Sequence, residues 1–155
     1  MKIIDFQWKI AANAHSKFEN FCQRDVESEK STVKKKMSVG RQYFQKLKKN
    51  KNLQILPPSN LFAKNIYWIV GIVIKNKKIK TKNMMKKLLR YGIQTRPFFW
   101  PMSEQKIFKK LKIFDKANYP NSKYLSEYGF YLPSYLKLNN NEIDYICSVV
   151  NKLMK

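Results

Sequence analysis

The chain has 155 residues, which is enough for one compact domain with its own core and too few for two large ones. Its apolar content of 44%, with ten Phe, nine Tyr and three Trp residues, excludes a wholly disordered protein. The net charge of +22 comes from 28 scattered lysines and only four arginines, so it indicates a solvated basic surface more than a specific nucleic-acid site.

A membrane-bound or exported protein is not expected either. The longest apolar run, from Ile66 to Ile74, has nine residues, whereas a helix needs ~20 to cross a bilayer. Asp5 and Lys9 interrupt the apolar residues near the N-terminus, so no secretory segment is expected. The cysteines, Cys22 and Cys147, indicate neither a disulfide framework nor a metal site, and the cytoplasm is the expected location.

Residues 1–33 are expected to form a poorly defined helical remnant, in which one helical face is lined by Phe18, Phe21, Cys22 and Val26. A helix is predicted from Val33 to Lys49, because apolar residues recur there at steps of three and four: Val33, Met37, Phe44 and Leu47. Leu53–Leu56 is predicted to be a short strand that Pro57 and Pro58 terminate.

The middle of the chain predicts a strand, a helix and a second extended segment. Residues 66–75 are expected to form a central strand that Tyr67 and Trp68 open. The next helix is predicted over Thr81–Leu89, capped by Thr81, with Gly92 in a left-handed conformation after it. Its expected buried stripe is Met84, Met85, Leu88 and Leu89. Ile93–Thr95 is then predicted to be extended.

Short helices are predicted over Glu104–Leu111 and Ser122–Tyr128, and a brief strand over Phe130–Pro133. The last helix follows a cap at Asn139–Asn141, and Glu142 and Asp144 lie in its first turn. Its apolar stripe is Ile143, Ile146, Cys147, Val150 and Leu153. The order of elements predicts an α+β fold, in which helices cover a small antiparallel or mixed sheet.

The most informative local feature is an arginine on a rigid turn. Arg96 follows the predicted extended segment, and Pro97 and Pro101 restrict the backbone around three aromatic residues, Phe98, Phe99 and Trp100. A guanidinium held in this way can bind a phosphate or a carboxylate with little further loss of freedom. The plain alternative is a surface turn with apolar anchors.

The sequence contains no self-sufficient catalytic set. His15 is the single histidine, and no carboxylates cluster around it, so a metal site is not expected. A cysteine nucleophile would have to share that same histidine. The four glycines, at positions 40, 71, 92 and 129, do not form a phosphate-binding loop.

From about Lys34 to its end, the chain resembles the C-terminal small domain of the DegT/DnrJ/StrS family of pyridoxal-phosphate-dependent sugar aminotransferases. The similarity is closest to the GDP-perosamine synthase branch. The segments that carry it, in order and with agreeing spacing, are Lys34–Leu47, Tyr67-Trp68, Tyr91–Gln105, Asn118–Pro120, Gly129–Ser134, and Leu138 leading into Glu142-Ile143. The resemblance implies that residues 34–155 form that small domain.

Members of this family use pyridoxal phosphate, held on a lysine, to move an amino group from glutamate to a keto sugar nucleotide. The lysine and most cofactor contacts lie in an N-terminal domain that has no counterpart here. The resemblance therefore implies no catalytic or cofactor-binding residue in this chain, and a nucleotide-sugar contact through Arg96, Trp100 and Ser103. Ser103 replaces a histidine of the closest relatives, and Gln7 and Lys9 replace an Asn and an Arg expected before the first helix.

Three hypotheses about function follow. The first is a truncated or split nucleotide-sugar aminotransferase, inactive alone, whose partner is a missing large domain or an aminotransferase subunit. The second is a basic nucleic-acid-binding module, whose binding would weaken steeply with salt. The third is a non-catalytic domain that docks on intact aminotransferase subunits through an exposed apolar face.

Overall fold

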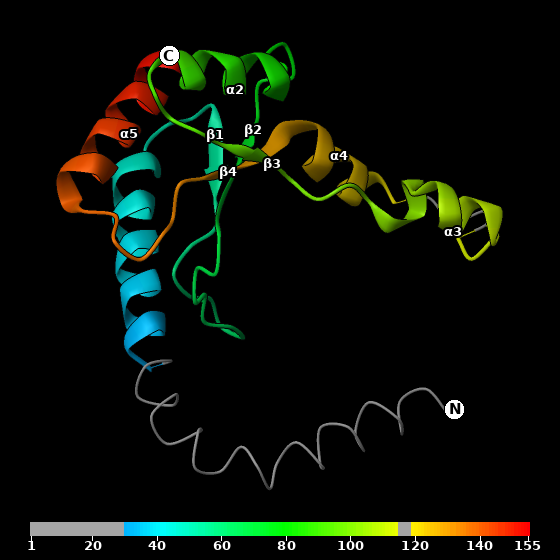
Figure 1. The fold of residues 1–155 in the computed structure, drawn as a ribbon, viewed down its shortest axis with the longest axis horizontal. Coiled ribbons are helices and arrows are strands. Elements are labelled where there is room, and N and C mark those ends of the chain that lie inside the picture. Colours follow the sequence, from blue (N-terminus) through cyan, green and yellow to red (C-terminus); the bar gives the residue numbers. More distant parts are fainter. Residues whose placement is uncertain (1–29, 115–118) are drawn as a thin grey trace, which may run out of the picture. The chain divides into compact units, whose positions relative to one another are not determined.

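The structure of the chain is a computed structural model that describes residues 30–114 and 119–155 (Figure 1). The chain divides into two compact units, Met1–Lys35 and Lys36–Lys155, and the second contains all the strands described below. Of the predicted N-terminal remnant only residues 30–33 are described, and they are helical. The predicted helical face from Phe18 to Val26, and the residues Gln7, Lys9 and His15, lie outside the described residues.

Four antiparallel strands form one small sheet, as predicted. They are β1 (Leu53–Ile55), β2 (Val70–Ile74), β3 (Arg96–Pro97) and β4 (Gly129–Leu132). Their order in the sheet is β1-β2-β4-β3, so β1 and β3 are the edge strands. Helices pack against this sheet, which confirms the predicted α+β class.

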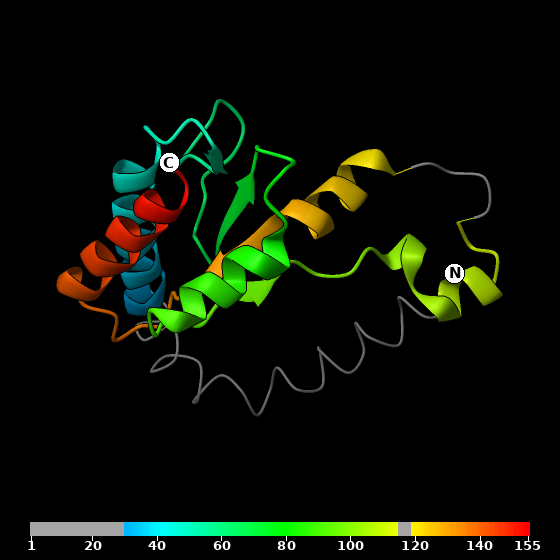
Figure 2. The same cartoon turned by 90° about the horizontal axis from the view of Figure 1, so that it is seen from above.

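The longest helices lie beside the sheet and enclose its core. A helix is described over residues 30–47, and its part from residue 36 onward lies alongside α5 (Asn140–Leu153) in both views (Figures 1 and 2). The helix α2 (Thr81–Arg90) also packs against α5. The remaining helices are short: η1 (Met102–Glu104), α3 (Lys106–Lys110) and α4 (Pro120–Tyr128).

The core forms between one face of the sheet and these helices. Alternate residues of β2 and β4 point into it, and each fully buried aliphatic or aromatic side chain contributes about 1.5–3 kcal/mol to stability. Its fully buried side chains include Tyr43, Leu47, Ile72, Ile74, Met84, Leu88, Phe130, Ile143 and Val150. Among the described residues, no helix is long and apolar enough to cross a membrane.

The central strand is shorter than predicted because its first residues bend. Tyr67 has a positive φ of 52°, and its backbone N–H donates to the side chain of Asn65 (2.8 Å). Its ring is buried directly over Gly40, where any Cβ would lie only 2.0 Å from it. The prediction that Tyr67 and Trp68 open the strand was therefore wrong, since the ladder begins at Val70.

The segment Ile93–Thr95, which we predicted to be extended and to lead into the arginine turn, forms no strand, and the strand β3 begins at Arg96 itself. Gly92, with a φ of 73°, lets the backbone N–H of Ile93 return to the carbonyl of Leu88 (3.0 Å), which closes α2. The left-handed Gly92 was predicted correctly. Because this closing motif uses residues 91–93, pairing with β4 begins only at Arg96, opposite Tyr131.

The two ends of α2 show a further difference between prediction and structure. Its N-cap is Lys80, and the hydroxyl of Thr81 donates instead to the carbonyl of Glu127 (2.7 Å) in α4. Met84 and Leu88 are buried as predicted, but Leu89 is 61% exposed.

The cap of α5, in contrast, is the one predicted from the sequence, because Asn139 and Glu142 form a reciprocal capping box.

Candidate functional site

A pocket of about 990 Å³ lies where the sheet edge meets the start of α5. The residues around β3, the chain that follows β4 and the first turns of α5 form its walls. Its polar and aromatic lining includes Lys36, Trp68, Gln94, Arg96, Glu142 and Tyr145. Of the three substrate-binding residues predicted from the sequence, Arg96 lines this pocket, whereas Trp100 and Ser103 do not.

Arg96 reaches the pocket from an edge strand. It pairs with Tyr131 of β4, and Pro97 follows it where only an edge strand tolerates the loss of an N–H. The side chain is exposed, and the residues that the structure describes offer it no ion pair. The guanidinium is thus held near the pocket by the sheet and retains its capacity for charge-assisted hydrogen bonds to an anion.

Lys36 supplies the second positive charge in the pocket wall. Its ammonium donates to the backbone carbonyl of Trp68 (3.1 Å) and to that of Ser134. Partial burial lowers the pKa of Lys36 from its usual value. About two turns further along the same helix, the hydroxyl of the buried Tyr43 donates to the carbonyl of Pro133 (2.8 Å). These bonds tie the helix over 30–47 to the chain that leaves β4.

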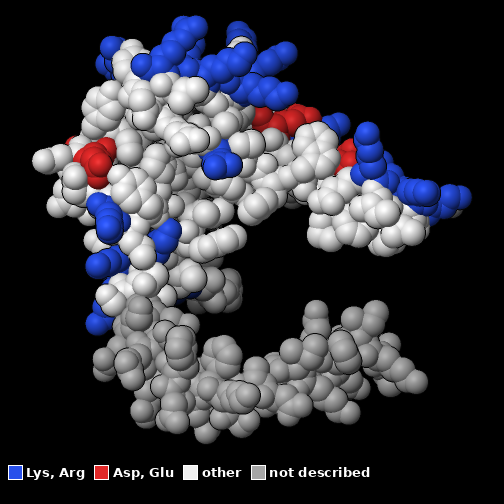
Figure 3. All heavy atoms as spheres, viewed as in Figure 1, with Lys and Arg blue, Asp and Glu red and all other residues white. Residues whose placement is uncertain are grey.

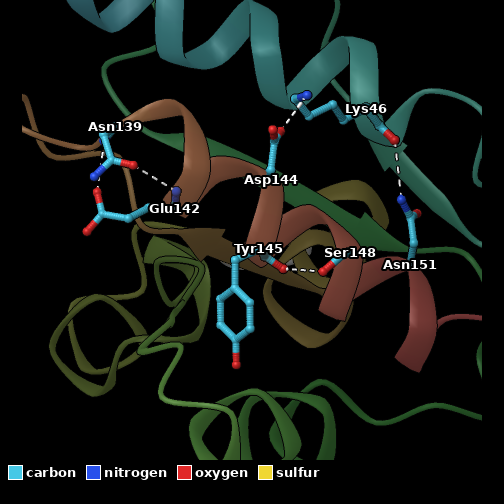
Figure 4. A network of polar contacts seen from close by, with 7 residues as sticks. All are labelled: Lys46, Asn139, Glu142, Asp144, Tyr145, Ser148 and Asn151. Atoms are coloured by element: carbon cyan, nitrogen blue, oxygen red, sulfur yellow. Dashed lines mark hydrogen bonds and ion pairs between the residues drawn. The ribbon is translucent and has the colours of Figure 1, made fainter.

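Glu142 is the one carboxylate among the described residues that line the pocket, and it is already engaged. Its side chain accepts from the backbone N–H of Asn139 (2.8 Å) and from the hydroxyl of Tyr135 (3.0 Å). Figure 4 shows this capping box at the start of α5, with the ion pair between Asp144 and Lys46 next along the helix. The carboxylate therefore fixes the pocket wall and leaves the positive groups in excess.

An aromatic cluster adjoins the pocket at Trp68. Phe98 lies over Gly71 and Gly129 of the two central strands and packs against Tyr131, with the two rings tilted by 50° and their centroids 4.7 Å apart. Phe99 contacts Tyr131 on one side and lies nearly parallel to Trp68 on the other, with centroids 6.4 Å apart. The three consecutive aromatics therefore have different roles: Phe98 anchors the turn, and Phe99 and Trp100 remain largely exposed.

The other residues that line the pocket carry no distinctive local signal in the sequence. Lys36 is one lysine among 28, and only the folded chain shows that its ammonium reaches two carbonyls. The sequence predicts Trp68 to be part of a strand and Glu142 to lie in the first turn of a helix. It does not predict that either residue lines a pocket. No cluster of three or more His, Cys, Asp or Glu that could hold a metal ion occurs within the described ranges.

Comparison with known proteins shows the family of the chain. The sequence pattern of the DegT/DnrJ/EryC1/StrS aminotransferase family matches residues 23–151. The chain belongs to this family. A search of curated proteins found no match.

Solved structures share the fold at low sequence identity. Spr1654 of Streptococcus pneumoniae, described as a sugar aminotransferase and solved in its PMP form, has a TM-score of 0.72 at 17% identity over 83% of this chain and 32% of its own. Helicobacter pylori PseC, an aminotransferase of pseudoaminic acid biosynthesis, has a TM-score of 0.68 at 20% identity over 79% and 32%. Escherichia coli GDP-4-keto-6-deoxy-D-mannose-3-dehydratase has a TM-score of 0.63 at 16% identity over 85% and 33%.

This aminotransferase-family chain spans about a third of the length of those three structures. The fold that it shares with them is the α+β unit described above. Because one of the three is named as a dehydratase and the other two as aminotransferases, this fold alone does not select the reaction.

Proposed function

We propose that this chain is the C-terminal, substrate-binding part of a pyridoxal-phosphate-dependent nucleotide-sugar aminotransferase of the perosamine-synthase type, and that it is inactive alone. Membership of the family supports the reaction class. One solved neighbour is named for a GDP-linked keto sugar, which supports a nucleotide sugar as the substrate class. The perosamine-type specificity rests on the resemblance to that branch of the series of segments between Lys34 and Ile143, Tyr91–Gln105 among them.

The observation that carries this proposal is the charge of the pocket. Arg96 and Lys36 both line it, while its carboxylate is engaged in capping α5. A sugar nucleotide carries a diphosphate, for which a fixed guanidinium is a strong partner. The indole of Trp68, which lines the same pocket, offers a face to the sugar or the base. Trp100 and Ser103, on the turn after Arg96, remain proposed substrate contacts.

The pocket does not by itself fit pyridoxal phosphate, the cofactor found in solved forms of two neighbours. That cofactor needs a free lysine and a carboxylate near its ring nitrogen. The pocket's lysine, Lys36, already donates to two carbonyls, and its carboxylate, Glu142, is engaged in the capping box. We therefore assign to this chain the binding and orientation of the substrate, and assign no step of the amino transfer to it.

Binding of GDP-mannose, measured by calorimetry at physiological salt, tests the proposal. We expect Arg96→Gln to weaken binding about tenfold or more, because a charged hydrogen bond contributes about 1.5–3 kcal/mol. The matched control is Arg90→Gln, which removes the same charge from the exposed face of α2 and should leave the affinity unchanged. Absence of binding, or an equal loss in both variants, would contradict the proposal.

The same variants test the nucleic-acid-binding alternative. Lys and Arg side chains gather over α2 (Figure 3), and this basic face is the observation that favours it. A nucleic-acid-binding module would bind DNA or RNA with a steep salt dependence. Its affinity would fall for Arg90→Gln at least as much as for Arg96→Gln.

A further inference from the structure

Half of the residues from Lys75 to Arg90 are cationic, and all of these cations are exposed. They form the basic face over α2 (Figure 3), which consists of Lys75, Lys77, Lys78, Lys80, Lys82, Lys86, Lys87 and Arg90. The ion pairs within the described ranges use Lys46 and Lys109, so no ion pair neutralises the basic face there. None of its residues lines the proposed substrate pocket or the core.

The packing of α2 holds these charges outward. Met84 and Leu88 are fully buried in the core and α2 packs against α5, so the opposite side of the helix faces the solvent. On that side Lys86 lies one turn from both Lys82 and Arg90, and like charges at this spacing repel each other. An anionic surface relieves this repulsion, and the helix already presents the charges to it together.

A groove in the basic face has room for a phosphate group. Its volume is about 330 Å³, at the lower end of the range for small-molecule sites. Five of the eight cations line it: Lys78, Lys80, Lys86, Lys87 and Arg90. Ammonium and guanidinium groups that converge in this way form charge-assisted hydrogen bonds to phosphate oxygens. The groove therefore suits a single phosphate-bearing headgroup.

The composition of the basic face favours a lipid bilayer over a nucleic acid. Seven of its eight cations are lysines, whereas base readers rely on arginine, and residues 75–90 contain no aromatic side chain on which a base could stack. Clusters of about four to eight lysines or arginines are typical of surfaces that bind anionic lipids. Leu89, which is 61% exposed and one turn beyond Lys86, adds an apolar group that the interface of a bilayer accepts.

We propose that the basic face and Leu89 bind the surface of a lipid bilayer that contains anionic phospholipids. In this arrangement α2 lies along the bilayer, its cations pair with phosphate headgroups, and one headgroup enters the groove. Such binding needs no helix that crosses the membrane, and the part of the chain that the structure describes contains none. The inference goes beyond the proposed function and does not depend on it, because Arg96 and its pocket take no part.

Cosedimentation of the whole chain with lipid vesicles tests this proposal. One set of vesicles contains phosphatidylglycerol and phosphatidylcholine in equal parts, and the other contains phosphatidylcholine alone. At physiological salt we expect the chain to bind the anionic vesicles and not the neutral ones, because the attraction is electrostatic.

The test variant combines Lys86→Gln and Lys87→Gln, both of which line the groove. The matched control combines Lys123→Gln and Lys137→Gln, which remove the same charge from exposed positions outside the basic face. We expect the test variant to bind anionic vesicles about twentyfold more weakly, since each lysine near an anionic surface contributes about a fivefold gain in affinity. The control should bind nearly as the wild-type chain does, and circular dichroism should show the same helix content in all three proteins.

Four outcomes would overturn the proposal: no binding to anionic vesicles, equal binding to both kinds of vesicle, equal losses in the two double variants, or tighter binding to a DNA duplex than to anionic vesicles. The last result, with the same loss in the test variant, would assign the basic face to a nucleic acid. GDP-mannose binding should be unchanged in the test variant, so failure here is distinguishable from failure of the proposed function.

Discussion

Phe98 depends on two glycines that leave room for its ring on the outer face of the sheet. A Cβ at Gly71 would lie 2.7 Å from the ring and would meet no other atom closer than 3.7 Å. We expect Gly71→Ala to destabilise the protein by about 1–3 kcal/mol, as overpacking usually does. Chemical denaturation measures this loss, which should nearly vanish in a Phe98→Ala background.

Gly129 provides the contrasting case for that double-mutant cycle. A Cβ there would lie 1.9 Å from the Phe98 ring and also 2.4 Å from the backbone carbonyl of Leu125. Removal of the ring therefore cannot rescue Gly129→Ala, since the carbonyl belongs to the backbone of α4. Failure of Phe98→Ala to rescue Gly71→Ala would show that the ring is not what requires glycine at position 71, and rescue of Gly129→Ala would show that the carbonyl of Leu125 does not require glycine at position 129.

Of the residues that line the pocket, only Arg96 was predicted from the sequence as a binding residue. Arg96 could be found because the prolines and aromatics that follow it mark a rigid turn, and it does line the pocket. Lys36 could not be found, because its role depends on two carbonyls that are far from it in sequence. The different roles of Phe98 and Phe99 follow from strand register, which the local sequence does not determine.

Among the elements, α5 has the most strongly specified start. The side chain of Asn139 accepts a hydrogen bond from the backbone N–H of Glu142 (2.9 Å). In turn, the side chain of Glu142 accepts one from the backbone N–H of Asn139. Substitution Asn139→Ala should lower the free energy of unfolding by about 1 kcal/mol, the usual cost of a lost N-cap. Thermal unfolding measures the loss, and Asn140→Ala, one residue into the helix, should be nearly neutral. Equal effects of the two substitutions would mean that the cap does not stabilise α5.

Elements with a strong local signal were predicted well, and those shaped by distant contacts were not. The helix after residue 30, the left-handed Gly92, β1, β4 and α5 all follow from periodicity or capping residues. In the first of these helices the buried face is nevertheless centred on Val39, Tyr43 and Leu47, because Tyr67 packs over Gly40. The late start of β2 and the displacement of β3 have the same kind of cause: contacts that close only in the folded chain.

On the scale of the whole molecule, positive charge is concentrated over α2 and opposes compaction. Between Lys75 and Arg90 there are eight cationic residues and no acidic one, and the first turn of α2 lacks an acidic residue that would complement its dipole. Lys82→Glu would supply that charge and place a carboxylate four residues before Lys86. We expect this substitution to stabilise the protein by about 0.5–1 kcal/mol at low salt.

Salt separates this electrostatic gain from a change in helix propensity. Screening shortens the range of charge interactions from about 30 Å at ~0.01 M salt to about 3 Å at ~1 M. The advantage of Lys82→Glu in thermal unfolding should therefore shrink as salt rises, while the wild-type chain itself becomes more stable. Lys82→Gln removes the charge without reversing it. The stability of this variant in thermal unfolding should therefore lie between that of the wild-type chain and that of Lys82→Glu. A gain that is equal at both ends of the salt range would refute charge crowding over α2 as its cause.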